Sequence, residues 1–224
     1  SNVLANYSDI DSVQIISHGG AGMVQLGNTV LNNENLQAYS DYLQGWRNSL
    51  TDNADILFYG CNVGEGELGV EFLQQLGDLT GADIAASNDL TGNSVLGGDW
   101  ELEVVTGNIE AESVLAPEIR NNYQGVLAVF KVTNNNDTTD TNNPQYQGSL
   151  RKAIIDANSN PDTDVIDLSA VTGLTNSGIW INSSLPTITQ SVFFVNNDIS
   201  KKVIIDGRWQ YQIISIDAPN VTVG

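Results

Sequence analysis

The stretch "VQIISHGGAGMV", residues 13–24, decides the first part of the fold, and "DILFYGCNVGEGE", residues 55–67, repeats its pattern. In each stretch a short apolar run ends at one reactive side chain, which is the only histidine of the chain in the first case and the only cysteine in the second. Such runs are typical of parallel strands covered by helices on both faces. Because the carboxyl ends of adjacent parallel strands meet at the ligand-binding edge of an α/β sheet, we expect His18 and Cys61 to lie together there.

The rest of the first half alternates strand-like and helix-like patterns. The run "ADIAAS" (82–87) predicts a third strand, and apolar residues at spacings of 3 and 4 predict amphipathic helices over 36–50 and 68–79, the second ended by Gly81. The segments 23–31 and 99–114 are interpreted as hairpins, the first around a Gly-Asn turn. This order of elements indicates an α/β domain with a mainly parallel sheet flanked by helices.

From about residue 128 the pattern changes. A polar loop (134–144) precedes one short helix within 148–161, and brief strands follow within 164–169, 178–185, 192–196, 202–207, 211–217 and 220–224. Strands this short cannot stand as independent hairpins, so stacked coils are the economical interpretation. We therefore predict two domains: an α/β domain over 1–127, and the first coils of an all-β, right-handed parallel β-helix over 128–224.

Composition limits the classes of function. The net charge of -19 with 41% hydrophobic residues indicates a folded, strongly anionic protein, which repels nucleic acid and anionic lipid. A single cysteine excludes an internal disulfide and a Cys-based zinc site. No apolar run approaches the roughly 20 residues of a membrane helix, and no signal segment opens the chain. We expect a soluble chain without membrane insertion, whose export signal is missing from the printed sequence.

The predicted strand tips hold the groups that cysteine chemistry needs. A thiol becomes a good nucleophile when an imidazole or a helix N-terminus favours its thiolate, and Cys61 precedes a helix predicted to begin near 64–67 while His18 is available as the base. Backbone N–H groups of Gly19 and Cys61 could hold the oxyanion of acyl transfer. The alternative is that Cys61 is a buried small hydrophobe.

Residues 10–125 resemble the caspase-like cysteine peptidases, which include gingipain, clostripain, legumain, separase and the caspases. Closer still, "IISHGGAGMVQLGN", "ILFYGCNVGEGELG", "TGADIAASNDLTG" and "GGDWELE" resemble an uncharacterised caspase-like domain of large bacterial surface proteins rich in repeats. The resemblance implies His18 as base, Cys61 as nucleophile and Gly19 as oxyanion donor. It places Asp89 in the substrate pocket, where an acidic side chain favours Arg or Lys before the scissile bond. Asp99 competes for that role, and Asp89 could instead be an ordinary turn residue.

Two features depart from that family. Gly60 stands where these peptidases usually have alanine, a change that we expect to matter little sterically. A strand and helix normally precede the histidine strand, whereas residues 1–12 are interpreted as only the tail of that helix. We expect the first strand to come from a missing N-terminal segment or from a processed partner chain.

The second half resembles the opening coils of β-helix domains in secreted, adhesin-like surface proteins, through "GSLRKAIIDANSNPDTDVIDLS", "SLPTIT", "VIIDG" and "IDAPNVTV". This resemblance implies a secreted or cell-surface protein. The dyad chemistry requires no cofactor, although acidic, Asn-rich turns over 134–143 and 160–169 have oxygen ligands suited to Ca²⁺ if they are not simply solvated loops. Arg120, near the domain boundary, is a candidate self-cleavage site.

These observations favour a cysteine endopeptidase with a His-Cys dyad that acts on a peptide or protein, its own chain included. The first alternative is an inactive caspase-like module used for adhesion or assembly. The second is a polysaccharide-binding β-helix, in which exposed tryptophans such as Trp100, Trp180 and Trp209 stack on sugars rather than pack in the core.

Overall fold

The computed structural model describes residues 3–27, 29–172, 178–196 and 202–223. The chain divides into two compact units, Ser1–Ala128 and Val129–Gly224, each with its own apolar core. Both units are mixed α/β, and their sheets are mostly parallel and flanked by helices.

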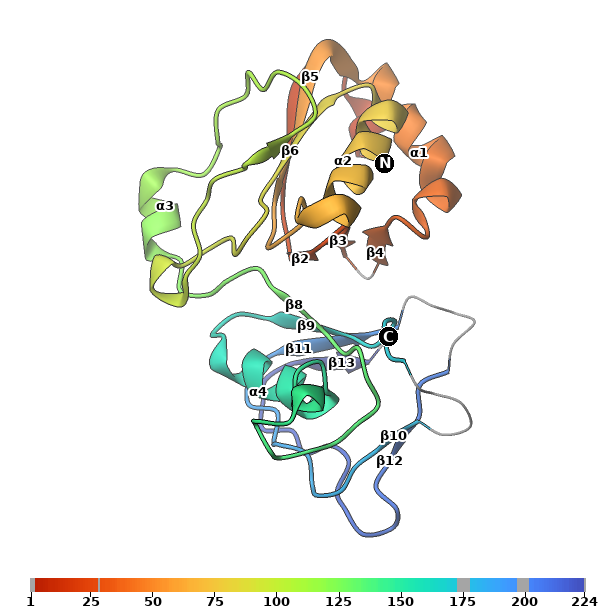
Figure 1. The fold of residues 1–224 in the computed structure, drawn as a ribbon. Coiled ribbons are helices and arrows are strands. Elements are labelled where there is room, and N and C mark those ends of the chain that lie inside the picture. The colour runs from red at the N-terminus through yellow and green to blue at the C-terminus, as the bar shows by residue number, and fades with distance from the viewer. Residues whose placement is uncertain (1–2, 28, 173–177, 197–201, 224) are drawn as a thin grey trace. The chain divides into compact units, whose positions relative to one another are not determined.

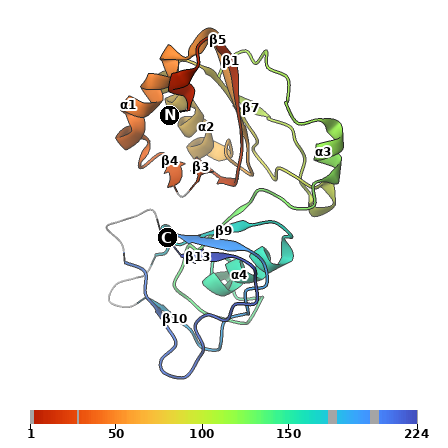
Figure 2. The ribbon, with the colours of Figure 1, turned by 180° about the vertical axis from the view of Figure 1, so that it is seen from behind.

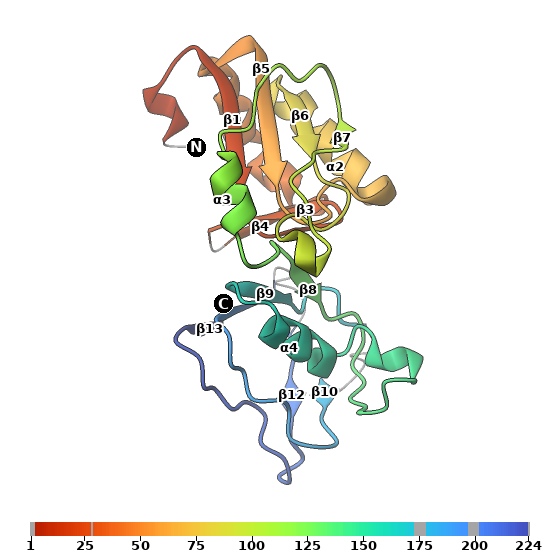
Figure 3. The same ribbon diagram turned by 90° about the vertical axis from the view of Figure 1, so that its left-hand side faces the viewer.

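The first unit is built on a four-stranded sheet in the order β1-β5-β6-β7 (Figure 1 and Figure 3). The three runs predicted as strands form β1 (Ile10–Ile16), β5 (Leu50–Tyr59) and β6 (Asp83–Ala86), which pair in parallel, and β7 (Val104–Val105) adds an antiparallel edge. The prediction of adjacent parallel strands ending at the histidine and the cysteine is therefore confirmed.

Alternation along β5 divides its side chains between two cores. Ile56 and Phe58 pack with the helices on one face, whereas Leu57 and Tyr59 pack against Trp100, Leu102, Ile109 and Ala111 on the other. The second face is thus covered mainly by an irregular segment, and the short helix α3 (Pro117–Asn122) lies on the same side (Figure 3). Every residue from Ala54 to Gly60 is buried, which explains why the run shows no polar alternation.

The helices only partly follow the sequence pattern. The second predicted helix is α2 (Gly66–Thr80), closed by Gly81 in the left-handed conformation (φ 74°), but Leu68 of its expected apolar stripe is exposed. The helix predicted over 36–50 is broken into η2 (Leu36–Tyr39), α1 (Ser40–Gln44) and η3 (Gly45–Asn48), and Leu50 already belongs to β5. Glycine lowers helix propensity, and the α-helical turns stop at Gly45.

One predicted hairpin is confirmed and the other is wrong. A small antiparallel sheet joins β2 (Gly19–Gly20), β3 (Met23–Leu26) and β4 (Thr29–Asn32); Asn28 of the predicted turn lies outside the described residues. Over 99–114 only β7 is a strand, preceded by a turn η4 (Ser94–Leu96). The physical reason is long-range: the buried Asp55 carboxylate accepts hydrogen bonds from the backbone N–H groups of Glu110 (2.9 Å) and Ala111 (2.8 Å) and fixes an irregular path.

The second unit contains a four-stranded parallel sheet in the order β13-β11-β9-β8 and a two-stranded parallel pair, β10-β12 (Figure 1, and from behind in Figure 2). Its strands are β8 (Val129–Lys131), β9 (Asp164–Asp167), β10 (Ile179–Trp180), β11 (Val192–Val195), β12 (Ile205–Asp206) and β13 (Val221–Val223). The segment 211–217, predicted as a strand, makes only an isolated bridge between Ile216 and Ile188. Gly224 lies outside the described residues.

The predicted helix of this unit is α4 (Leu150–Ser159), preceded by the turn η5 (Pro144–Tyr146). Ser149 caps the helix by accepting from the backbone N–H of Lys152, and Leu150 and Ile154 are buried in the unit's core, whereas Ile155 is partly exposed. At the N-terminus the described residues before β1 hold one short turn, η1 (Leu4–Asn6), and β1 already begins at Ile10, so the interpretation of residues 1–12 as the tail of a helix is wrong. Among the described residues no helix is both long and apolar enough to span a bilayer.

Candidate functional site

The strand ends of β1 and β5 bring the histidine and the cysteine to one edge of the sheet. Ile16 is paired with Tyr59, and the backbone N–H of Ser17 donates to the Tyr59 carbonyl oxygen at 3.0 Å. His18 and Cys61 follow directly after these paired positions. The carboxyl edge of two neighbouring parallel strands therefore carries both reactive groups.

The Cys61 thiol is buried, with 1% of the residue exposed. Its sulfur accepts a hydrogen bond from the backbone N–H of Thr91 (3.2 Å) and lies 3.6 Å from the Thr91 carbonyl oxygen. Burial raises the pKa of the Cys61 thiol to about 12, against the opposing effect of backbone hydrogen bonds from Thr91 and Leu127 and with a small addition from the Asp89 charge. The thiol is accordingly protonated at neutral pH. The helix predicted to follow Cys61, α2, begins at Gly66, within the predicted range of 64–67.

His18 is half-buried, and its Nδ1 lies 3.2 Å from the carbonyl oxygen of Ala128. A carbonyl oxygen can only accept, so this contact is a hydrogen bond when Nδ1 carries the proton. In that tautomer Nε2 is the basic nitrogen of the ring. In this tautomer the proton-accepting nitrogen of His18 is therefore Nε2.

The two backbone donors predicted for an oxyanion converge on one oxygen atom. The Gly19 N–H donates to the Leu127 carbonyl oxygen at 3.1 Å, and the Cys61 N–H donates to the same oxygen at 3.2 Å. Gly19 has no room for a side chain, because an added Cβ would lie 2.4 Å from Cγ2 of Val63. A pair of N–H groups converging in this way is the arrangement that stabilises a developing oxyanion.

Gly60 also lies in a closely packed position. A Cβ added there would lie 2.6 Å from the backbone oxygen of Ser17. The prediction that alanine in place of Gly60 would matter little sterically is therefore wrong for this chain, because the obstacle is main chain that cannot rotate away.

An extended segment, Gly125–Ala128, lies along the site. The Leu127 N–H donates to the Thr91 carbonyl oxygen (3.0 Å), the Asn93 N–H donates to the Gly125 carbonyl oxygen (2.8 Å), and Gly92 and Val126 form an antiparallel bridge. Gly92, at φ 138°, permits this approach, since its added Cβ would lie 2.5 Å from the Gly125 oxygen. The sequence-based prediction did not include Thr91 or Leu127, and the one local signal for Leu127 is the short apolar run that follows Gly125.

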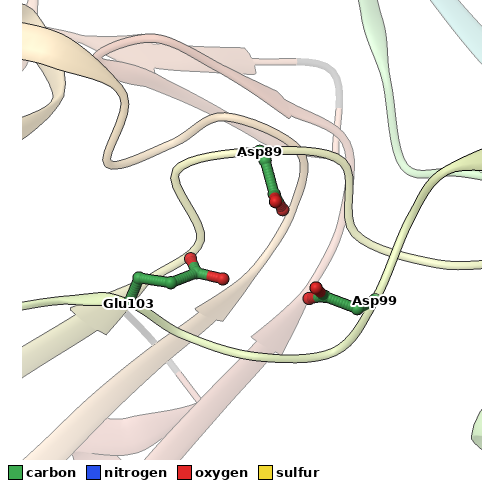
Figure 4. Close-up of side chains that lie close together, drawn as sticks. All are labelled: Asp89, Asp99 and Glu103. Carbon is green, nitrogen blue, oxygen red and sulfur yellow. The ribbon is translucent and has the colours of Figure 1, made fainter.

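Three exposed carboxylates gather beside the loop that follows β6 (Figure 4). Oxygens of Asp89, Asp99 and Glu103 all lie within 4.8 Å of one another, and the Asp89 backbone oxygen accepts from the N–H of Asn62 at 2.6 Å. The pKa of Asp89 is raised by partial burial and by the charges of Asp99 and Glu103. Asp89 and Asp99, the two candidates for the acidic substrate-binding residue, thus lie together. Glu103 also belongs to the cluster and was not predicted from the sequence.

Arg120 lies on α3 and lines a cavity of about 270 Å³ together with Asp99 and Trp100. Its backbone N–H donates to the Ala116 carbonyl oxygen at 3.2 Å, so the peptide bond after it belongs to a helical turn. Peptidases bind the residues around the scissile bond in an extended conformation. The helical bond after Arg120 does not have that conformation.

The acidic turns considered for Ca²⁺ have structural partners in the second unit. Asp137 is buried in an ion pair with Arg151 (2.6 Å) and also accepts from the backbone N–H of Asn182 (2.7 Å). Asp164 and Asp167 are buried in β9. Of the tryptophans, Trp100 packs against the rings of Tyr59 and Tyr123, Trp180 lies under the Arg208 guanidinium, and Trp209 is fully exposed.

A family model described as "Domain of unknown function (DUF4347)" matches residues 1–127. No curated protein and no solved structure matches the chain. The matched range contains β1, β5, β6, the His18–Cys61 edge and the carboxylate cluster, and it ends at Leu127. Since the match covers more than half of the sequence, the chain belongs to the DUF4347 family.

Proposed function

We propose that residues 1–127 form a caspase-like cysteine endopeptidase domain, with Cys61 as nucleophile and His18 as general base. The observation that carries the proposal is the convergence of the Gly19 and Cys61 N–H groups on one carbonyl oxygen, at the sheet edge that also holds the imidazole and the thiol. Acyl transfer needs these groups together: a nucleophile, a base and two donors for the oxyanion.

The buried thiol defines how the reaction would begin. With a pKa of about 12 the sulfur is not a free thiolate, so His18 would remove its proton as the sulfur attacks the carbonyl carbon. The imidazolium would then protonate the leaving amine, and water would hydrolyse the thioester with His18 again as base.

Substrate preference is proposed from the carboxylate cluster of Asp89, Asp99 and Glu103. Three negative charges beside the residue after Cys61 would attract an arginine or lysine side chain of a substrate. The same oxygen-only set of ligands would suit Ca²⁺, which prefers carboxylates, although the dyad chemistry does not need it. Arg120 stays a candidate for self-cleavage only if α3 unwinds.

For the remainder of the chain we propose the start of a right-handed parallel β-helix in a secreted or cell-surface protein. All-parallel pairing among β8, β9, β11 and β13, and between β10 and β12, supports stacked coils. The proposed partner is a peptide or protein substrate. The charge of -19 argues against nucleic acid.

One observation favours a second candidate, an inactive module for adhesion or assembly. Cys61 is 1% exposed, and the chain's own Leu127 occupies its oxyanion donors. If this cover never opens, the dyad residues serve only to hold the segment Gly125–Ala128 in place.

The experiment that decides between the two is native labelling of Cys61 together with peptide hydrolysis. Because Cys61 is the only cysteine, labelling by iodoacetamide reports on this site alone. An active peptidase hydrolyses arginyl or lysyl reporter peptides, with or without Ca²⁺; Cys61→Ala abolishes turnover and His18→Ala lowers it about 100-fold or more. Urea-unfolded protein is the control for an intact thiol. No labelling, no turnover and no self-cleavage in the folded protein would leave only the inactive module.

A further inference from the structure

The segment Gly125–Ala128 lies where the proposed peptidase would hold its substrate. The Leu127 carbonyl oxygen accepts from both Gly19 (3.1 Å) and Cys61 (3.2 Å). In acyl transfer, the carbonyl that lies between the oxyanion donors belongs to the residue before the scissile bond. This position identifies Leu127 as that residue.

The pairing of the segment is that of a bound peptide. Leu127 donates its N–H to Thr91, Gly125 accepts from Asn93, and Gly92 and Val126 form an isolated bridge, so the segment runs antiparallel to Thr91–Asn93. Main-chain hydrogen bonds along a sheet edge are a recurring way of holding an extended peptide. The Leu127 side chain is buried, with the residue 5% exposed. An apolar residue therefore precedes the proposed bond, and the cluster of Asp89, Asp99 and Glu103 is left to bind a basic side chain at another position of a substrate.

The two reacting groups lie beside the bond that follows Leu127. The Cys61 backbone N–H donates to the Leu127 carbonyl oxygen at 3.2 Å, and the His18 Nδ1 lies 3.2 Å from the Ala128 carbonyl oxygen. A parallel bridge between Gly19 and Ala128 holds the residue after the bond next to the histidine. The cysteine therefore contacts the residue before the bond, and the histidine contacts the residue after it.

From this juxtaposition we propose that the peptide bond between Leu127 and Ala128 is cleaved by the His18–Cys61 dyad of the same chain. The inference rests on the proposed function and replaces Arg120 by Leu127 as the residue before the cut. The Cys61 sulfur forms a thioester with the Leu127 carbonyl carbon while its proton passes to His18. The C–N bond breaks as His18 gives that proton to the Ala128 nitrogen. One water molecule then hydrolyses the thioester, leaving a Leu127 carboxylate and restoring the thiol.

The bond between Leu127 and Ala128 lies at the end of the first compact unit. The family match ends at Leu127, and the first compact unit ends at Ala128. Cleavage at this bond therefore separates the DUF4347 domain from all residues that follow it. No other described peptide bond has its carbonyl oxygen bound by both Gly19 and Cys61.

The test is to express the whole 224-residue chain, with Cys61→Ala in parallel, and to map fragments by intact mass and N-terminal sequencing over time. We expect fragments 1–127 and 128–224, with a new N-terminus at Ala128, from the wild-type chain and none from Cys61→Ala. Leu127→Met, which keeps an apolar residue, should still be cut at the same bond. Leu127→Glu, which puts a charge in a buried position, should lower the rate about 100-fold. Leu68→Glu is the matched control, because Leu68 is 58% exposed on α2, and it should leave the rate unchanged.

The outcomes separate this inference from the proposed function. Cysteine-dependent cleavage at another bond, such as the one after Arg120, or turnover of reporter peptides by a chain that stays intact, overturns the inference and leaves the peptidase. Equal cleavage of Leu127→Glu and wild type also overturns it. An intact chain with no turnover and no native labelling of Cys61 overturns both.

Discussion

At the scale of single residues, burial rather than sequence position decides the chemistry of the titratable groups. Cys61 and Asp164 follow or occupy buried strand positions, and in both the neutral form is favoured because the charged form loses its water. For Cys61 this keeps the thiol protonated at neutral pH. For Asp164 it makes the stability of the second unit depend on pH.

Asp164→Asn should remove that dependence. Burial raises the pKa of Asp164 to about 8, its Oδ1 accepts from Asn160 (2.6 Å), and its Oδ2 has no partner among the described residues. The folded carboxyl holds its proton above the ordinary pKa of 3.8, so its stabilising contribution is complete below about pH 4 and is lost as the pH rises through about 8.

We therefore expect Asp164→Asn to raise the free energy of unfolding by about 5 kcal/mol at pH 8 and by almost nothing at pH 4. Urea denaturation of wild type and Asp164→Asn at pH 4 and at pH 8, followed through the unfolding transition of the second unit, measures this difference in free energy of unfolding. The exposed Asp217→Asn is the control and should show no such trend. A constant difference at both pH values would contradict the argument.

Gly60→Ala tests the close packing between the two strand ends. The added methyl group would meet the Ser17 backbone oxygen at 2.6 Å, and we expect a loss of about 1–3 kcal/mol in the free energy of unfolding. Gly45→Ala, at φ -61° with open space around it, is the control and should be neutral or slightly stabilising. Equal stability of the two variants would show that the strand ends can move apart.

At the scale of elements, the sequence predicted those helices and strands that neighbouring residues determine, and it failed where residues far apart in the sequence determine the path of the chain. The strands β1, β5 and β6 and the hairpin of β3 and β4 follow from runs and turns within a few residues. The path over 99–114 does not, because Asp55 fixes it from far along the chain through Glu110 and Ala111. Leu68 lies on the predicted stripe of α2 but is exposed, since nothing in the periodicity says how wide the covered face is.

Some residues of the candidate site could likewise be predicted from local sequence, and others could not. The sequence pointed to His18, Gly19 and Cys61 because each stands at the end of an apolar run beside a small or polar residue. Thr91 and Leu127 enter the site only through pairing between segments distant in the sequence, which no local pattern encodes. Glu103 joins Asp89 and Asp99 for the same reason.

Gly92→Ala should weaken the pairing that covers Cys61. Its Cβ would lie 2.5 Å from the Gly125 oxygen and would force Gly125–Ala128 away from Thr91–Asn93. In the folded protein we expect iodoacetamide to label Cys61 about 10-fold faster or more than in the wild type, because labelling tracks the open population. Gly97→Ala is matched in backbone, with φ 88°, but its nearest neighbour is at 3.9 Å, and it should label at the wild-type rate.

At the scale of the whole molecule, the two units have separate apolar cores, and we expect each to unfold in its own transition. Arg151→Met should identify the second. It leaves Asp137 buried and uncompensated, which costs about 3–5 kcal/mol, and should lower only the melting temperature of the second unit in calorimetry.

Lys152→Met is the matched control on the same helix. Its ion pair with Asp156 is partly exposed, so its removal should cost less than about 0.5 kcal/mol. If Arg151→Met lowers both transitions equally, the units are coupled in stability. If it lowers neither, the buried ion pair contributes nothing measurable.

If the proposed function holds, the segment Gly125–Ala128 is also a tethered competitor for any molecule that binds beside Gly19 and Cys61. A peptide or inhibitor added from outside would have to displace a ligand whose effective concentration, for a short tether, is on the order of millimolar or higher. Compounds screened against the uncut chain would then show an affinity far weaker than their intrinsic affinity. Ranking such compounds would require a form of the protein in which this segment no longer binds Gly19 and Cys61.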